Sequence, residues 1–330
     1  MNHSIKIWQL YPILVPLTIF TILIALVLIG VTITTNSVIG ANITNATITT
    51  KVYVWNTEPD LYNVSISPAP IELTAGGAMV INCTGFFYDY NGWEDAINQS
   101  INATLYDTVS SSNNAVNDNN IHYTNSSCRS SCSVVGSTTT NGSCSCLFTV
   151  QYYANASSWV CNMTLTGGAG NATERQYLNF TDSMSAGSNI NRLLAISIPT
   201  LIDYGNLTVT ELSNLIAHNL TNTGNIPLNL SVRGYGGSLE SIGGNQSMFC
   251  DSGNISIGYE KFSLNNISYI NMNNLSSIDT PINLTISQRI NDSEIELGRD
   301  RNQTFWAIQI PLSVGGYCNG TIVFTATSLT

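Results

Sequence analysis

The stretch DYNGWED, residues 89–95, concentrates oxygen atoms of the kind that bind calcium. Asp89, Asn91 and Asp95 offer carboxylate and amide oxygens, which hard cations such as Ca²⁺ prefer. The spacing is not that of an EF-hand, because the glycine comes too early and Ser100 stands where a bidentate glutamate is required. Asn-Gly is also a strong turn signal. We therefore expect a strand-connecting turn, with a calcium site at these three residues as the alternative; no other cofactor is predicted.

Groups that could perform catalysis are sparse. His122 and His218 fall in different halves of the chain, and no nucleophile elbow, zinc-protease motif or phosphate-binding loop is present. A polysaccharide-active enzyme would need paired carboxylates in a cleft, and Glu94, Asp95 and Asp107 are the only candidates near aromatic residues. The aromatic clusters at 86–93 and 150–159 indicate either core or a surface that binds glycans or proteins. We predict that the chain is not an enzyme.

The eight cysteines form an even set, which in an exported chain indicates disulfides. A zinc site from C-x3-C and C-x-C is the rival interpretation, but the second pair is too tight for the usual spacing. Cysteines that face each other in one antiparallel ladder have nearly constant summed positions, and inward-facing cysteines on separate strands can join two sheets. These criteria predict three pairs: Cys83 with Cys161, Cys128 with Cys146, and Cys132 with Cys144. Cys250 and Cys318 remain and lie in the same predicted domain, so they are expected to form the fourth pair.

Glycan acceptor triplets are more frequent than the composition predicts. The sequence has 24 N-x-S/T triplets, against about nine expected from its asparagine, serine and threonine content. Those on strands alternate with inward apolar residues, so that a bulky glycan would point into water. The predicted acceptors are Asn63, Asn82, Asn102, Asn125, Asn155, Asn162, Asn206, Asn219, Asn229, Asn283, Asn302 and Asn319.

The N-terminal region predicts the compartment. No charged residue lies between Lys6 and Lys51, and residues 13–33 are almost purely aliphatic, long enough to cross a bilayer as one helix. Lys6 favours a cytoplasmic N-terminus. We predict a cytoplasmic tip and transmembrane signal anchor over 1–40, with a cleaved signal peptide as the alternative. The protein would thus be anchored in the membrane through residues 13–33, with its C-terminal part outside the cell.

The formal net charge of −10 and the lack of a basic stripe argue against nucleic acid as a partner.

Beyond the anchor, hydrophobic residues alternate with period two and are separated by Gly, Asn and Pro. The segments 79–87, 158–165, 226–232, 305–312 and 321–326 read as strands with one inward face. We therefore predict an all-β protein. A polar stalk over 41–58 leads to one Ig-like β-sandwich over 59–185 and a second over 186–330, with the boundary in the polar run 181–189.

Two resemblances accompany these patterns. The segments DYNGWEDAINQSINATLYD, HYTNSSC and CLFTVQYYANASSWVCNMTL resemble the Ig-like sandwich modules of uncharacterised archaeal cell-surface proteins, across most of residues 60–330. The segments LIDYGNLTV and HNLTNTGNIPLNLSVRG, within 201–234, are similar to Hydin/ASH-type Ig-like modules. Both resemblances imply a sandwich fold and a structural or adhesive module.

We expect a membrane-tethered, densely N-glycosylated surface protein with a structural or adhesive role in the cell envelope. Its partners would be envelope proteins or glycans. The first alternative is a pilus-like filament subunit, in which a strand around residues 47–56 completes the sheet of a neighbour. The second alternative is a glycan-binding or polysaccharide-active envelope protein.

Overall fold

The computed structural model describes residues 48–54, 57, 59–96, 100–167, 180–291 and 299–329. The chain forms two compact units, Met1–Val54 and Trp55–Thr330, and each is considered by itself. The described part of the first unit, residues 48–54, has neither helix nor strand. The apolar segment 13–33 lies outside the described residues, and none of the helices within them is long and apolar enough to span a bilayer.

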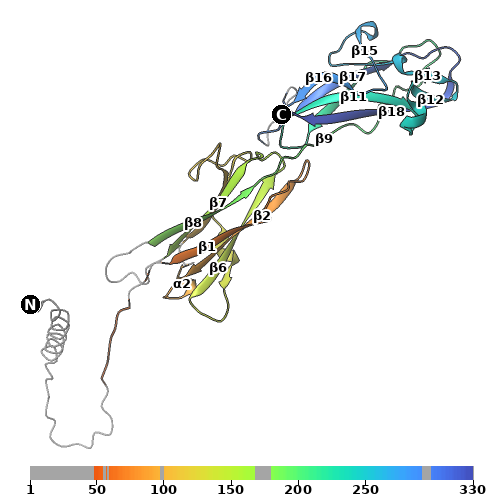
Figure 1. The fold of residues 1–330 in the computed structure, drawn as a ribbon. Helices are drawn as coiled ribbons and strands as arrows, with labels where there is room; N and C mark the ends of the chain where they lie inside the picture. The colour runs from red at the N-terminus through yellow and green to blue at the C-terminus, as the bar shows by residue number, and fades with distance from the viewer. Residues whose placement is uncertain are drawn as a thin grey trace, which may run out of the picture. The chain divides into compact units, whose positions relative to one another are not determined.

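The second unit is built from four antiparallel sheets, so the predicted all-β class is correct (Figure 1). The first sheet has the order β1-β2-β6-β5. Its strands are β1 (Asp60–Ser67), β2 (Ala78–Tyr88), β6 (Asn141–Gln151) and β5 (Cys132–Val134). The second sheet has the order β4-β3-β7-β8. Its strands are β4 (His122–Asn125), β3 (Ser100–Asp107), β7 (Ser158–Gly167) and β8 (Phe180–Asn189).

These two sheets enclose the first hydrophobic core. In β2 and β7 every second residue points inward, as period-two alternation requires. Trp159, Cys161 and Leu165 of β7 are buried, and so are Ile81 and Cys83 of β2. An isolated parallel bridge between Ile71 and Ile190, both buried, adds a backbone link between the segments that follow β1 and β8.

The connection from β2 to β3 crosses from one sheet to the other. It contains the Asn91-Gly92 turn and one helical turn, α2 (Trp93–Ala96). Two backbone hydrogen bonds, Asp89 N to Thr140 O and Trp93 N to Thr139 O, hold it against the loop before β6. The predicted strand-connecting turn is therefore present, but it joins two sheets and does not form a hairpin.

The predicted boundary at 181–189 is wrong, because that run is strand β8. It pairs with β7 from Phe180↔Gly167 to Asn189↔Ser158. Its residues are small and polar, but Met184 and Ala186 alternate toward the first core and pack against it. An edge strand needs little apolar surface when one face is solvated, which is why its composition resembles a linker.

The remaining strands form two further sheets. One has the order β15-β14-β17-β10-β9 and the other β13-β12-β18-β11-β16. The first contains β9 (Ile196–Ser197), β10 (Ile216–Asn222), β14 (Glu260–Ser263), β15 (Asn273–Asn274) and β17 (Arg301–Ile308). The second contains β11 (Leu228–Gly236), β12 (Gln246–Ser252), β13 (Asn254–Ser256), β16 (Thr280–Ile286) and β18 (Gly315–Ser328). Short helical turns lie at η2 (Cys128–Ser131), α3 (Glu240–Gly243), η3 (Ile257–Tyr259) and η4 (Tyr269–Asn271).

A second hydrophobic core lies between these sheets. Leu228, Leu230 and Val232 of β11 are buried on alternate positions, as the sequence predicts. Trp306 of β17 is fully buried and packs at 5.6 Å, centroid to centroid, from Phe262. The polar stretch 263–284 includes the start of β16, whose Ile282 and Leu284 belong to this core.

Candidate functional site

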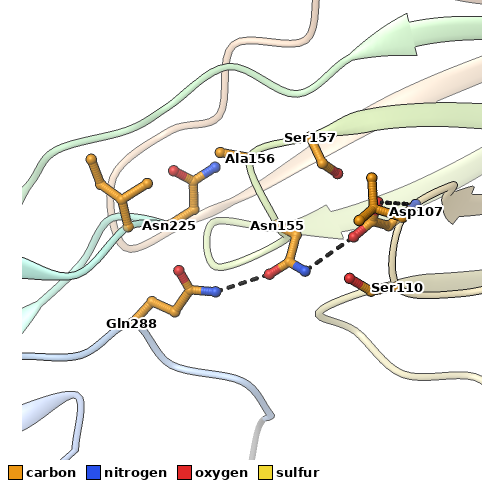
Figure 2. A pocket seen from close by; sticks show the side chains of 9 residues that line it. Asp107, Ser110, Asn155, Ala156, Ser157, Asn225 and Gln288 are labelled. Atoms are coloured by element: carbon orange, nitrogen blue, oxygen red, sulfur yellow. Dashed lines mark hydrogen bonds between the residues drawn. The ribbon is translucent and has the colours of Figure 1, made fainter. Parts of the chain in front are cut away.

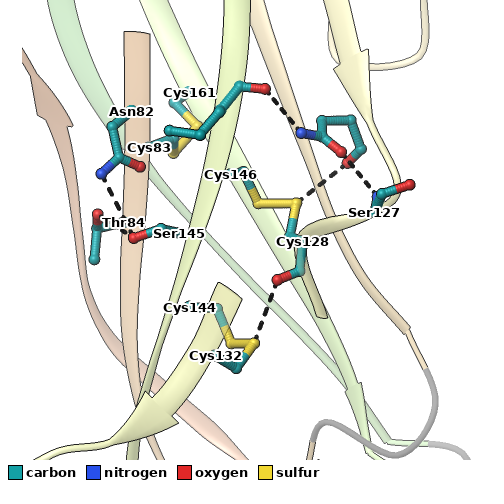
Figure 3. The surroundings of a disulfide bond; sticks show 12 residues. Asn82, Cys83, Thr84, Ser127, Cys128, Cys132, Cys144, Ser145, Cys146 and Cys161 are labelled. Carbon is teal, nitrogen blue, oxygen red and sulfur yellow. Dashed lines mark hydrogen bonds between the residues drawn. A yellow bond between two sulfur atoms is a disulfide. The ribbon is translucent and has the colours of Figure 1, made fainter. Parts of the chain in front are cut away.

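The eight cysteines form four disulfides, in the pairs that the sequence predicts. Cys83 of β2 joins Cys161 of β7 and so ties the two sheets of the first core together, with Cα atoms 6.4 Å apart (Figure 3). Cys132 and Cys144 are register partners of β5 and β6. The rival zinc interpretation fails, because every sulfur of its two pairs lies in a disulfide.

A second disulfide of the same region joins Cys128 of η2 to Cys146 of β6 and closes a short loop. In sequence it encloses the Cys132–Cys144 loop, and Figure 3 shows the two bridges near each other, so both bridges hold one hairpin. Cys250 of β12 and Cys318 of β18 are register partners in the last sheet. The described residues include no free cysteine.

The twelve predicted glycan acceptors all keep some contact with solvent. Five are exposed: Asn63, Asn206, Asn219, Asn283 and Asn319. Seven are half-buried: Asn82, Asn102, Asn125, Asn155, Asn162, Asn229 and Asn302. On β2 and β7 the acceptors Asn82 and Asn162 point away from the core that their neighbours Cys83 and Cys161 enter. Their orientation therefore fits the predicted phase; attachment of glycans stays a prediction.

The predicted calcium triad is only partly assembled. Asp89 is fully buried, and its Oδ1 accepts a hydrogen bond from Asn91 N at 2.8 Å. Burial raises the pKa of Asp89, and repulsion from the Asp95 carboxylate adds to the rise. Asn91 Oδ1, however, accepts hydrogen bonds from Thr57 N and Thr57 Oγ1, both at 2.6 Å. Asn91 is thus engaged by the chain that enters the first sandwich, and it does not join the two aspartates as an open ligand.

The candidate carboxylates for glycan chemistry are not brought together. Asp95 lies before β3 and Asp107 ends it, and at about 3.3 Å per residue the strand separates its ends by roughly 20 Å. A glycosidase pair needs its carboxyl groups within about 10 Å. Glu94 is exposed on α2. The three carboxylates therefore do not form a catalytic pair.

The two aromatic clusters differ in burial. In the segment 150–159, Tyr152, Tyr153 and Trp159 are buried and belong to the structural interior. In the segment 86–93, Tyr88 is 41% exposed and stacks on Tyr62 with ring centroids 4.6 Å apart. Only the second of these clusters offers aromatic rings to a partner.

A polar hollow of about 350 Å³ lies where the loop after β6 meets residues of the second half (Figure 2). Asn155 stands at its centre, with Nδ2 donating to Asp107 Oδ2 at 3.1 Å and Oδ1 accepting from Gln288 Nε2 at 2.9 Å. Burial alone would raise the pKa of Asp107, but hydrogen bonds from Val109 N, Asn155 and nearby serines hold it below its ordinary value. The Asp107 carboxylate thus anchors the Asn155 side chain and the backbone of Val109 by hydrogen bonds.

Asn222 and Asn225 lie near this hollow in sequence and are both buried, and their side chains make several hydrogen bonds to the backbone. Asn225 Nδ2 donates to the carbonyl oxygens of Ala154 and Asn191, each at 3.0 Å, while its Oδ1 accepts from Leu193 N at 2.6 Å. Asn222 Nδ2 donates to Ile226 O at 2.8 Å. Asn225 thus links the two halves of the unit through Ala154, while Asn222 fixes the second half around the same TNTGN run.

Comparison with known proteins identifies no family: no family model and no curated protein matches the sequence. Two of the similar solved structures come from pilus assembly. One is from a chaperone–tip adhesin complex of CFA/I fimbriae, with 12% identity, 83% of this chain and 84% of that chain covered, and a TM-score of 0.31. The other is from a chaperone–tip subunit pre-assembly complex of the archaic chaperone-usher Csu pili of Acinetobacter baumannii, with 10% identity, 80% and 99% covered, and a TM-score of 0.36. At these TM-scores neither match assigns a function.

Proposed function

We propose that the chain is an exported surface protein with a structural or adhesive role in the cell envelope. The observation that carries this proposal is the pairing of all eight cysteines in four disulfides. Disulfides persist in oxidising compartments and are rare where glutathione keeps thiols reduced. The anchor over 13–33 and the glycans on the acceptor asparagines belong to the same proposal.

The strand order supports an Ig-like assignment for the first sandwich. The orders β1-β2-β6-β5 and β4-β3-β7-β8 correspond to A-B-E-D and C′-C-F-G of an immunoglobulin sandwich. The Cys83–Cys161 bridge then joins strands B and F, as in antibody domains. The buried tryptophan, Trp159, lies on strand F and not on strand C. A sandwich scaffold of this kind can serve a structural or adhesive role without catalytic groups.

Surface labelling of intact cells tests the role. A membrane-impermeant amine reagent should label the native protein in intact cells, and external protease should remove it, while a cytoplasmic marker stays unlabelled. The protein should be recovered in the membrane fraction with no thiol reactive toward alkylating reagents. Recovery in the cytoplasmic fraction with reduced cysteines would contradict the proposal.

The filament reading remains the second candidate, because one observation favours it. Ile48, Val52 and Val54 are each at least 79% exposed and pair with no strand. Exposed β-branched residues in an extended segment could add a strand to the sheet edge of another copy. N-terminal sequencing of the surface protein decides this: a new N-terminus shortly before residue 48, in sheared filaments, supports the filament, and an intact Met1 excludes it.

A further inference from the structure

The β2–β3 connection contains two carboxylate oxygens without partners. Asp89 is 0% exposed, and its Oδ2 accepts no hydrogen bond. Asp95 Oδ2 is likewise shielded from solvent and has no hydrogen-bond partner. Buried polar groups nearly always have partners, because an unpaired one costs the full desolvation penalty. Two such oxygens within one seven-residue loop therefore need a common explanation.

Within the part of the chain that the structure describes, no cationic side chain forms a salt bridge with either carboxylate. Both salt bridges recorded among the described residues involve Arg233, which lies in the second half of the chain. The Asp89 and Asp95 carboxylates interact unfavourably with each other. A fully buried carboxylate oxygen close in sequence to a second shielded one is costly to leave uncompensated. A divalent cation neutralises both.

We propose that this loop binds a divalent cation of the calcium type through Asp89 Oδ2 and Asp95 Oδ2. Both are hard oxygen ligands, which suit Ca²⁺ and exclude soft-ligand metals. The proposal revises the ligand set expected from the sequence, because Asn91 Oδ1 is occupied by Thr57.

The backbone around the pair is already committed, which limits the strength of the site. Asp89 O accepts from Gly92 N, and Gly92 O accepts from Asp95 N. No group of three His, Cys, Asp or Glu side chains arranged for a metal occurs in the described ranges. Water must therefore complete the six to eight ligands that Ca²⁺ takes. We expect a dissociation constant of about 10⁻⁴–10⁻³ M, the range of extracellular calcium modules.

Terbium luminescence and thermal unfolding of the purified full chain test the site. Trp93 lies between the two ligands in sequence, so excitation of tryptophan should sensitise Tb³⁺ bound there, and Ca²⁺ should displace it. Ca²⁺ at ten times its dissociation constant should raise Tm by roughly 3 °C relative to EDTA, with a smaller effect from Mg²⁺.

Single amide variants separate the site from nonspecific binding. Asp89→Asn keeps the acceptor for Asn91 N, and Asp95→Asn alters a half-buried side chain, so both should fold. Each should weaken Ca²⁺ binding at least about tenfold, because one of two charged ligands is lost. Asp118→Asn is the matched control, since Asp118 also accepts a hydrogen bond from the backbone two residues on. An unchanged Tm with Ca²⁺ in the wild type, or equal Tb³⁺ emission in all variants, would overturn the proposal.

Discussion

Glu260 is an acidic side chain that the second core almost entirely buries, at 2% exposure. Its Oε1 accepts one hydrogen bond, from Tyr204 OH at 2.7 Å. Burial raises the pKa of Glu260 from 4.5 to about 7, although the hydrogen bond from Tyr204 acts to lower it. The folded state therefore retains a proton that the unfolded chain releases near pH 4.5. Stability that is fully present below pH 4.5 is lost as the pH rises toward 7.

Glu260→Gln should remove most of this pH dependence, because glutamine stays neutral and can still accept from Tyr204. We expect the free energy of unfolding of the wild type to fall by about 3 kcal/mol between pH 4.5 and 8, and that of the variant to change much less. Urea unfolding followed by tryptophan fluorescence measures both. Glu94→Gln, on an exposed residue, should keep the wild-type dependence; equal slopes in all three proteins would contradict the assignment.

Gly224 is required by a close approach of backbone. A Cβ atom at this position would lie 2.1 Å from Leu193 O, in the loop that Asn222 and Asn225 hold. Gly224→Ala should therefore destabilise the protein by about 1–3 kcal/mol or more, measured as a lower urea midpoint. Gly258→Ala is the control, because nothing lies within 4 Å of its added Cβ and its stability should barely change.

At the scale of elements, the disulfides differ in what they constrain. Cys83–Cys161 closes a separation of 78 residues, and the chain-entropy model assigns such a loop about 4–5 kcal/mol. Cys132–Cys144 closes only 12 residues inside the loop of Cys128–Cys146. The outer bridge already restricts that hairpin, so the inner one removes little further entropy from the unfolded chain.

Replacing Cys83 and Cys161 by alanine should therefore lower Tm far more than replacing Cys132 and Cys144. The first double variant loses the inter-sheet bond and leaves a cavity in the core; the second should lose less than about half as much free energy of unfolding. Differential scanning calorimetry compares the two. Similar losses in both variants would show that loop length does not determine the contribution.

Strands with strong alternation were predictable from sequence, and weakly apolar ones were not. β2, β7 and β11 carry inward apolar residues at every second position, so their faces and the Cys83–Cys161 pair follow from phase. β8 has small polar residues and resembles a linker; its strand character depends on pairing with β7. The hydrogen bonds from Thr57 to Asn91 Oδ1 join residues 34 positions apart. No local sequence pattern predicts such a contact. Asn225 likewise bonds to Leu193 and Ala154, which lie 32 and 71 positions away.

At the scale of the whole molecule, Asn155 is both a predicted glycan acceptor and part of the contact between the two halves. Its amide donates to Asp107 and accepts from Gln288, so a glycan on Nδ2 would compete with both contacts. The enzyme that attaches the glycan has to reach the acceptor in an unfolded or locally open chain. The bonds to Asp107 and Gln288 oppose local opening around Asn155.

Asn155 should therefore be the least occupied acceptor, whereas exposed Asn63 and Asn319 should be the most occupied. Glycopeptide mapping of the native protein measures the occupancies. Gln288→Ala removes one of the two bonds and should raise occupancy at Asn155 without altering Asn63. Full occupancy at Asn155 in the wild type would contradict this prediction, and bare acceptors throughout would contradict the glycosylated surface protein itself.

The two long covalent loops have a mechanical consequence. Cys83 and Cys161 are separated by 78 residues and Cys250 and Cys318 by 68, and at about 3.5 Å per extended residue these loops hold back roughly 270 Å and 240 Å of contour length. Under tension along the chain, the disulfides carry the force, and the residues inside the two loops cannot extend. A molecule pulled by fluid drag would thus lengthen only by the chain outside these loops, which shield more than half of the first sandwich and about half of the second from the force.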